Sequence, residues 1–272
     1  MAMIPPHLSF SYDKAIERIT AFIKESVKEA GARGVVIGLS GGSDSSLATA
    51  LSVKALGKEK VKVVFLPDRE SSPDSRVAAR AVAESLELEL VTIDITGVVE
   101  SALAALGLSY ATADKIVKGN IKVRTRMMLL YGIANNEGRL VVGTGDRSEW
   151  LIGYFTKWGD VAGDIYPNIG LYKTQVRALG KYIGLPAEVI NRAPTPDLWP
   201  GHTAEGELGL SYDVIDEVLY WVFDEGLDPD KVPEKAGVPK EAVERVMEMY
   251  RRSEHKRNPL KAPFRSFKEL TQ

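Results

Sequence analysis

The distribution of apolar and polar residues predicts alternating helices and strands over the first half of the chain. Between Tyr12 and Ala30 the apolar residues fall on one helical face, and Gly31 stands where the helix would end. A short run of β-branched residues then predicts a strand over 35–39. The stretch LATALSVKAL predicts a second helix, which ends at Gly57. The chain therefore opens with a helix, a strand and another helix.

The same alternation continues as far as the middle of the chain. A second strand is predicted by VKVVFLP around Val63, a third by LELVTIDI around Val91, and a fourth by the apolar residues 140–142. Ser72 and Pro73 are typical of the cap and first residue of a helix between the second and third strands. Because strands alternate with helices, we expect an α/β fold: a Rossmann-like, doubly wound parallel sheet with helices on both faces.

The pattern changes beyond Tyr154. Glycines, prolines and aromatic residues are scattered as far as Leu210, and one firm helix is predicted over 174–183. We expect loops here that close over a site, with residues 197–210 acting as a lid that excludes water.

The C-terminal part predicts two further helices. One carries Val214, Val218 and Val222 on one face, and the other follows Pro239 towards Tyr250. No repeat, low-complexity tract or flexible linker interrupts the sequence. We therefore interpret residues 1–272 as a single domain with a helical C-terminal extension.

Charge and composition narrow the classes of function. The 35 basic and 37 acidic residues give a net charge of −2, which indicates neither nucleic acid nor a membrane surface as a partner. No apolar run approaches the roughly 18 residues of a membrane span, and the N-terminus lacks a signal-peptide pattern, so we expect a cytoplasmic protein. The chain has no cysteine, which excludes disulfides and any thiol nucleophile supplied by it.

The sequence GLSGGSDS follows the first predicted strand and precedes the next helix. In an open parallel sheet, loop amides and a helix N-terminus at this place present free donors to a ligand. The two glycines let the backbone approach an anion, and the serines add hydroxyl donors. The predicted phosphate-binding residues are Gly38, Leu39, Ser40, Gly41, Gly42, Ser43, Asp44 and Ser45.

Asp44 is the single acid of this turn, and a phosphate that it faced directly would repel it. We expect it to hold a magnesium ion that bridges phosphate oxygens. The alternative is a flexible turn in which Asp44 complements a helix dipole. Neither G-x-x-x-x-G-K-[ST] nor a helix-opening G-x-G-x-x-G follows the first strand, which disfavours a P-loop NTPase and a dinucleotide-binding Rossmann site.

The turn resembles the SGGxDS motif of the N-type ATP pyrophosphatases, which split ATP between its α- and β-phosphates and leave AMP on the substrate. Four later segments resemble one family of that group, the NAD synthetases, and the resemblance spans nearly the whole chain. They are GNIKVRTRM from Gly119, GTGDRSE from Gly143, GYFTKWGD from Gly153 and EHKRNP from Glu254. The second of these departs from bacterial relatives, which often read GTDHAAE.

The resemblance implies roles for particular residues. Thr144, Lys173 and Thr195 would contact ATP, and Glu149 would join Asp44 on magnesium. Asp44 and Lys173 are the expected catalytic residues, because a lysine charge fits a triphosphate that is losing pyrophosphate. The residues expected to bind the dinucleotide substrate are Arg124, Lys157, Asp164, His255 and Lys256.

The resemblance also implies a reaction. The nicotinate carboxylate of deamido-NAD would attack the α-phosphate of ATP to form an adenylate, and ammonia would displace AMP to give NAD. Magnesium would be the cofactor, and the protein would be a homodimer with dinucleotide sites at the interface. Relatives that use glutamine carry a glutaminase domain with a cysteine nucleophile. The chain has neither that extra length nor a cysteine, so we predict free ammonia as the nitrogen donor.

Two other functions share parts of this pattern. Another adenylating ligase, such as a GMP synthetase-like enzyme, would have the turn without the later segments. A non-catalytic adenine-nucleotide-binding module would have no use for the paired metal ligands Asp44 and Glu149. Pyrophosphate release in the presence of deamido-NAD, xanthylate or no acceptor would distinguish these alternatives.

Overall fold

The computed structural model describes residues 4–263, and its centre is a parallel β-sheet. The strands are β1 (Gly34–Gly38), β2 (Val61–Phe65), β3 (Leu90–Thr92) and β4 (Arg139–Val142). Their order is β3-β2-β1-β4, and each pairing is parallel. The predicted α/β fold is confirmed, and the direction of winding reverses between β1 and β4.

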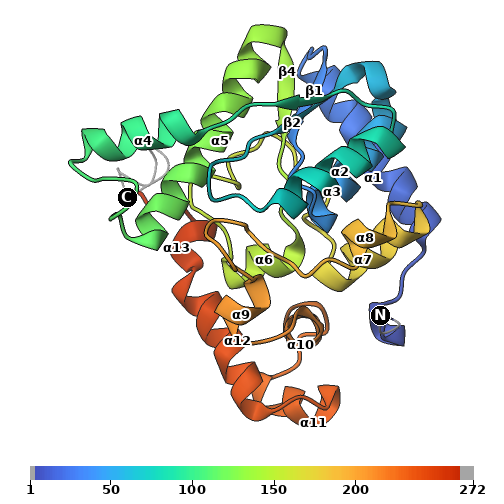
Figure 1. The fold of residues 1–272 in the computed structure, drawn as a ribbon. Helices are drawn as coiled ribbons and strands as arrows, with labels where there is room; N and C mark the ends of the chain where they lie inside the picture. The colour runs from blue at the N-terminus through green and yellow to red at the C-terminus, as the bar shows by residue number, and fades with distance from the viewer. Residues whose placement is uncertain (1–3, 264–272) are drawn as a thin grey trace.

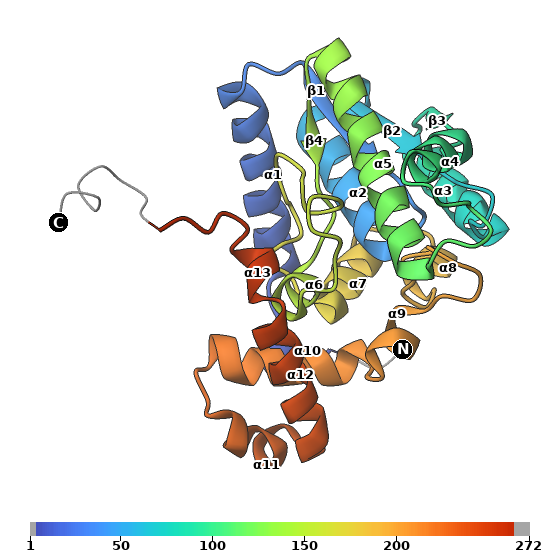
Figure 2. The same cartoon turned by 90° about the vertical axis from the view of Figure 1, so that its left-hand side faces the viewer.

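Helices cover both faces of the sheet (Figures 1 and 2). On one face lie α1 (Tyr12–Glu29), α2 (Ser43–Leu56), α3 (Pro73–Ser85), α7 (Lys173–Tyr182) and α8 (Ala187–Ile190). On the other lie α4 (Thr96–Ala105) and α5 (Lys115–Glu137). The helices predicted over 12–30 and 174–183 are therefore confirmed to within a residue or two.

Alternation along the strands explains why both faces are apolar. Val35 and Ile37 of β1 pack into the core with α1 and α2, whereas Val36 points the other way, into the core with α5. Val63 and Val64 of β2 divide in the same manner. A strand whose two faces are both buried reads as a continuous apolar run, which is the pattern that the sequence shows.

The remaining elements are short or belong to the C-terminal part. They are η1 (Pro6–Leu8), η2 (Lys58–Lys60), α6 (Arg147–Ile152), α9 (Ala204–Leu208), α10 (Tyr212–Leu219), η3 (Tyr220–Asp224), η4 (Pro229–Lys231), α11 (Val232–Ala236), α12 (Lys240–Arg252) and α13 (Glu254–Arg257). Figure 1 shows α10, α11 and α12 grouped beyond the carboxyl ends of the strands, where they form a separate apolar core with α6. The predicted helical extension is confirmed.

The apolar face predicted for the first of these C-terminal helices was partly wrong. Val218 is buried, but Val214 and Val222 are only half-buried, and the core side is formed instead by Ile215 and Leu219. The helix changes to π geometry over η3, so the spacing of four residues from Val218 to Val222 no longer keeps these two side chains on one face.

The segment predicted as a lid is not loop throughout, because α9 occupies residues 204–208. No helix within residues 4–263 is long and apolar enough to cross a membrane. The cytoplasmic location stays a prediction.

Candidate active site

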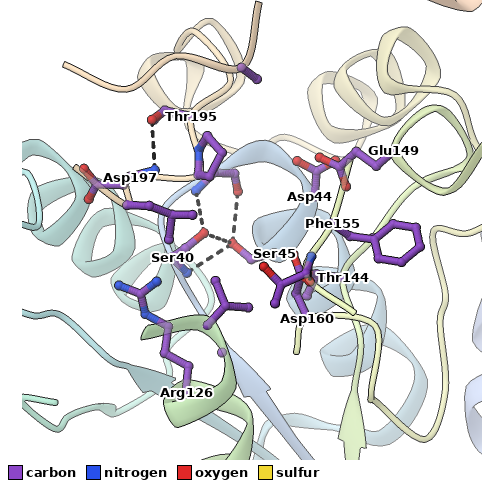
Figure 3. Close-up of a pocket in the computed structure, with 18 of the residues that line it drawn as sticks. Ser40, Asp44, Ser45, Arg126, Thr144, Glu149, Phe155, Asp160, Thr195 and Asp197 are labelled. Carbon is purple, nitrogen blue, oxygen red and sulfur yellow. Dashed lines mark hydrogen bonds between the residues drawn. The ribbon is translucent and has the colours of Figure 1, made fainter. Parts of the chain in front are cut away.

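The predicted phosphate turn joins β1 to α2 at the point where the strand order reverses. Gly42 is the N-cap of α2, so Ser43, Asp44 and Ser45 form the first turn of the helix, whose N–H groups have no partner within the helix. Ser45 Oγ accepts a hydrogen bond from the amide of Ser40 at 3.2 Å and lies 3.1 Å from Ser40 Oγ (Figure 3). The serines therefore hold the turn in shape, and the amides in the first turn of α2 are left to bind an anion.

The two glycines of the turn have different roles. Gly41 has a φ of +81°, and a Cβ there would lie 2.7 Å from the carbonyl oxygen of Ser75 and 2.8 Å from Ala78 Cβ in α3. Gly42 lines the cavity beside the turn, and a Cβ there would meet only Ser40 Oγ, at 3.5 Å. Gly41 thus lets α3 pack against the turn, and the predicted close approach of an anion applies to Gly42.

A cavity of about 440 Å³ lies at the carboxyl ends of β1, β2 and β4. It is closed by the N-terminal half of α5 and by residues 192–204, which run over it. Its walls include most of the residues predicted to bind ATP or metal. These are Gly38, Leu39, Ser40, Gly42, Ser43, Asp44, Ser45, Thr144, Glu149, Lys173 and Thr195.

The ammonium of Lys173 lies among three carboxylates in this cavity. Its Nζ is 2.8 Å from Asp44 Oδ1, 2.9 Å from Asp146 Oδ2 and 2.7 Å from Glu149 Oε1. Figure 3 shows the carboxylates of Asp44 and Glu149 side by side. The two residues predicted as metal ligands and the predicted catalytic lysine therefore meet, although they come from three separate helices.

These groups shift one another's pKa values. Burial by itself would lower the pKa of Lys173, but the charges of Asp146, Asp44 and Glu149 outweigh it and hold that pKa well above its ordinary value. Burial would raise the pKa of Asp44, but the Lys173 charge and hydrogen bond lower it overall. Burial raises the pKa values of Asp146 and Glu149 above their ordinary range. Lys173 is therefore a fixed positive charge.

Asp146 was not predicted from the sequence. Its side chain caps α6 by accepting from the amide of Glu149 at 2.8 Å, and the Glu149 carboxylate in turn accepts from the amide of Asp146. The signal was readable, because Asp-x-x-Glu before an apolar residue is a capping box. This local structure aims both carboxylates towards Lys173.

The three carboxylates fit a divalent cation. One oxygen of each lies within 4.8 Å of the others, and Asp146 Oδ2, although buried, makes no hydrogen bond of proper geometry to any described residue. Carboxylate oxygens are the ligands that Mg²⁺ prefers. The three carboxylates thus suit the predicted metal. In this structure the ammonium of Lys173 is the cation that lies among them.

The C-terminal helices hold Lys173 in position. Its amide donates to Ser148 Oγ at 2.9 Å, and Ser148 Oγ donates to the carboxylate of Asp216 in α10. Asp216 also accepts from the amide of Thr174 at 2.8 Å. Burial raises the pKa of Asp216 to about 6. The start of α7 is therefore anchored by the helical extension.

Arg126 lines the other end of the cavity and was also missed. Its Nε donates to the carbonyl oxygen of Leu66, at the end of β2, at 2.9 Å. Within residues 4–263 no carboxylate lies within 4.0 Å of its guanidinium, and burial lowers its pKa. In Figure 3 the side chain points from α5 towards Ser40. A cation left unpaired in a cavity favours a ligand that accepts hydrogen bonds.

A third missed residue, Asp160, lies in the segment GYFTKWGD. It is open to the cavity, where Figure 3 places it below Thr144, and it accepts from the amide of Thr156 at 2.8 Å. Its side chain is exposed where it faces the cavity, yet desolvation by the protein around it raises its pKa to about 7. Asp160 is therefore suited to accept a proton near neutral pH.

The residues predicted to bind the dinucleotide do not gather in the cavity. Arg124 is exposed and donates to the carbonyl oxygen of Lys157 at 3.1 and 3.2 Å. Asp164 accepts from the amide of Val141 at 2.7 Å, at the edge of the sheet. His255 is exposed on α13.

Lys256 alone of this predicted group lines the cavity. Its ammonium donates to the carbonyl oxygens of Gly153 and Phe155, each at 2.7 Å. It therefore ties α13 to the segment that carries Asp160.

The model of the NAD synthase family matches residues 15–260. The chain belongs to the NAD synthase family. It is 48% identical to the NH3-dependent NAD+ synthetase of Hyperthermus butylicus over 257 residues, which are 94% of this chain and 92% of that relative. The family predicted from the motifs is thus confirmed.

Two solved structures have the same fold. The NMN synthetase of Francisella tularensis has a TM-score of 0.81 and 35% identity, and the alignment covers 95% of this chain and all of that one. The NH3-dependent NAD synthetase of Campylobacter jejuni has a TM-score of 0.77 and 28% identity, with the same coverage. The architecture of the family therefore extends over nearly the whole chain.

Proposed function

We propose that this protein is an ammonia-dependent NAD synthetase, a ligase that converts deamido-NAD, ATP and ammonia to NAD, AMP and pyrophosphate. The observation that carries the proposal is the position of Lys173, which lies with Asp44 and Glu149 beside the anion-binding turn in one cavity. Membership of the family and the ammonia-dependent relatives support the same reaction.

ATP binds with its phosphates at the turn and its base at the opposite end of the cavity. The N-terminus of α2 and the hydroxyls of Ser40 and Ser45 donate to the phosphates. The apolar ends of β2 and α5 accept the flat base, and Arg126 donates to one of its ring nitrogens. Thr144 and Thr195 line the space between these two ends.

Asp44 and Glu149 are proposed to ligate Mg²⁺. When bound, Mg²⁺ neutralises charge on the phosphate oxygens of ATP. The two side chains are 20% and 24% exposed, so both are accessible from the cavity.

In the first step the nicotinate carboxylate attacks the α-phosphorus of ATP. A bond forms between carboxylate oxygen and phosphorus, and the bond from the α-phosphorus to the bridging oxygen breaks, so that pyrophosphate leaves. The ammonium of Lys173 and the amides of α2 stabilise the charge that develops on the departing group. The product is an acyl adenylate, which water would hydrolyse.

Residues 192–204 protect that adenylate. The carboxylate of Asp197 accepts from Ser75 Oγ at 2.8 Å, and the carbonyl oxygen of Leu198 accepts from Lys122 Nζ at 2.8 Å, so the segment is tied over the cavity. This arrangement supports the lid predicted from composition, with its start shifted towards Arg192.

In the second step ammonia attacks the carbonyl carbon of the adenylate. A carbon–nitrogen bond forms, the bond from carbon to the AMP oxygen breaks, and the nitrogen must lose a proton. Asp160 is the proposed acceptor, because it faces the cavity and its pKa of about 7 leaves it ionised above neutral pH.

We also propose that the protein acts as a homodimer. Arg124 and Lys157 lie outside the cavity, close to the exposed side chains of Met128 and Trp158, which are 56% and 55% exposed. A second copy that covers this surface would enclose the part of a dinucleotide that extends beyond the cavity. The exposed apolar side chains supply the contact area.

Pyrophosphate release from ATP tests the proposal. The purified protein with Mg²⁺ and ammonium should release pyrophosphate with deamido-NAD and should not with xanthylate or without an acceptor. Glutamine should not replace ammonium. Equal rates with xanthylate would contradict the proposal, and Asp44→Ala should be inactive in every arm.

The likeness to the Francisella NMN synthetase favours one second candidate, amidation of the mononucleotide. Nicotinate mononucleotide is therefore a separate arm of the same assay. A higher kcat/KM with the mononucleotide than with deamido-NAD would replace the proposed substrate and leave the chemistry unchanged.

A further inference from the structure

We propose that Asp146 is a positioning residue that keeps the ammonium of Lys173 in place when a divalent cation takes the other two carboxylates. The inference rests on the proposed function, because it concerns how Lys173 acts beside the metal. It assigns a role to a residue at which the segment GTGDRSE departs from the bacterial pattern GTDHAAE.

Burial separates the three carboxylates around Lys173 into two kinds. The side chains of Asp44 and Glu149 are 20% and 24% exposed, and both line the cavity. Asp146 and Lys173 also line the cavity, but their side chains are only 0% and 1% exposed. A cation that arrives from the cavity therefore meets Asp44 and Glu149 first.

Lys173 and a divalent cation cannot both occupy the two carboxylate oxygens that Nζ contacts. Nζ already lies 2.8 Å from Asp44 Oδ1 and 2.7 Å from Glu149 Oε1. A magnesium ion bound to the same oxygens would sit about 2.1 Å from each of them. The two positive charges would then be crowded together, so the ammonium must withdraw from these oxygens as the metal binds.

Asp146 gives the withdrawn ammonium a partner. Its Oδ1 is fixed by the amide of Glu149, whereas Oδ2 lies 2.9 Å from Nζ and lacks any hydrogen bond of proper geometry from the described residues. The backbone of Lys173 does not need to move, because its amide is anchored on Ser148 Oγ. A rotation of the side chain therefore exchanges three carboxylate partners for one.

The consequence for the reaction is a second cation held beside the first. If Lys173 keeps Asp146, its ammonium stays at the edge of the metal site and faces the phosphates. Without Asp146, the ammonium would either remain on Asp44 and Glu149 and oppose the metal, or lie in the cavity without a partner.

A crystal structure of the wild-type protein with Mn²⁺ and α,β-methylene-ATP tests this directly, because the anomalous signal of Mn²⁺ locates the metal. We expect Mn²⁺ on Asp44 and Glu149, with Lys173 Nζ within hydrogen-bond distance of Asp146. Mn²⁺ on an Asp146 oxygen, or Lys173 turned away from Asp146, would overturn the inference alone. No Mn²⁺ at Asp44 and Glu149 would overturn the metal role in the proposed function as well.

A pair of variants adds a measurement in solution. Asp146→Asn and Asp146→Ser both keep a side chain that caps α6. We expect either change to weaken Mn²⁺ binding by about tenfold, measured by electron paramagnetic resonance with the ATP analogue present. The reason is that the unplaced ammonium of Lys173 would repel the metal, and a repulsion of about 1.4 kcal/mol lowers affinity tenfold. The Lys173→Met variant should bind Mn²⁺ more tightly than the wild type.

The combination of both changes separates a positioning role from metal ligation. In the Lys173→Met background, Asp146→Asn should change Mn²⁺ affinity less than in the wild type, because no ammonium remains to be placed. An equal loss in both backgrounds would show that Asp146 acts on the metal and would overturn the inference. Thermal unfolding of each variant confirms that the protein is folded.

Discussion

Asn168 donates a hydrogen bond of 2.9 Å from Nδ2 to the backbone carbonyl oxygen of Asp44, which lies 124 positions earlier in the chain. The same amide reaches the carbonyl oxygen of Thr144 at 3.4 Å, and Asn168 is fully buried. One side chain therefore joins the phosphate turn after β1 to the segment after β4. These two segments carry the proposed metal ligands Asp44 and Glu149.

Removal of this link should damage both stability and activity. We expect Asn168→Ala to lower the free energy of unfolding by about 1–3 kcal/mol, because two partly buried carbonyls lose this donor. The KM for ATP should rise as well, because Asp44 and Thr144 are no longer held together. Urea unfolding and steady-state kinetics measure the two effects. The exposed Asn136→Ala is the control and should change neither.

The turn glycine Gly41 should tolerate no side chain. Gly41→Ala combines a φ of +81° with a Cβ only 2.7 Å from a backbone oxygen, so we expect a loss of stability well beyond the roughly 1 kcal/mol that strain alone costs. Gly57→Ala is a matched control, since Gly57 has a φ of +80° and nothing lies within 4 Å of its Cβ position. Chemical unfolding compares the two variants. Equal losses would mean that contact with α3 is unimportant.

Lys173→Met should make stability depend on pH. Loss of the ammonium leaves buried carboxylates unpaired, which costs about 3 kcal/mol at neutral pH. Burial already raises the pKa values of Asp146 and Glu149, and without Lys173 they rise further. The folded state then binds more protons than the unfolded state, so the deficit should shrink as pH falls below these raised values and grow as pH rises.

Thermal unfolding of Lys173→Met and the wild type at several pH values measures this effect. Mg²⁺ should restore part of the stability of the variant, because it neutralises the same carboxylates. Stability that stays equal to the wild type from pH 5 to 8 would contradict the pairing that the structure shows.

The acid side of the pH–rate profile should report the ionisation of Asp160. At constant free ammonia, we expect the rate of amidation by the wild type to rise with pH through about 7, as Asp160 becomes ionised. Asp160→Asn should lose this limb and about 100-fold in kcat, which is typical for loss of a general base. Asp164→Asn, outside the cavity, should keep the limb. An unchanged limb in Asp160→Asn would assign the proton to another group.

Two arginines of one helix should separate the two substrates. Arg126→Met is expected to raise the KM for ATP by about 10- to 100-fold, because a hydrogen bond from a charged donor is worth roughly 1.5–3 kcal/mol when lost. Arg124→Met should raise the KM for deamido-NAD instead, because Arg124 lies outside the cavity beside Lys157. Initial rates with each substrate varied in turn make the comparison. The reverse pattern would exchange the two assignments.

Local sequence signals predicted much of the fold. The strands were readable because both faces of the sheet are buried and their residues are continuously apolar, and the turn because glycines and serines follow the first strand directly. The apolar face was misjudged at Val222, because the helix changes from α to π geometry at η3 and the spacing of four residues fails there.

Some of the residues in the motifs face the cavity and others do not, and tertiary packing again decides which. Lys173, Asp44 and Glu149 carry charges in segments with a clear pattern, and the structure brings them together. Arg124 and Arg126 stand in one segment, and only the direction of α5 against the sheet decides which of them faces the cavity. A spacing of two residues turns a helical side chain through more than half a circle.

The sequence by itself determined the parallel α/β fold, the anion-binding turn and the family, because each depends on short-range patterns of apolar residues, glycines and charges. Only the tertiary structure decided that Gly41 lets α3 pack against the turn and that Asp146 is the third carboxylate around Lys173. It also decided that Asp160 and Arg126 face the cavity. These facts depend on burial and on distances between segments up to 129 positions apart. Such distances are set by how helices pack on the sheet, and no local pattern encodes them.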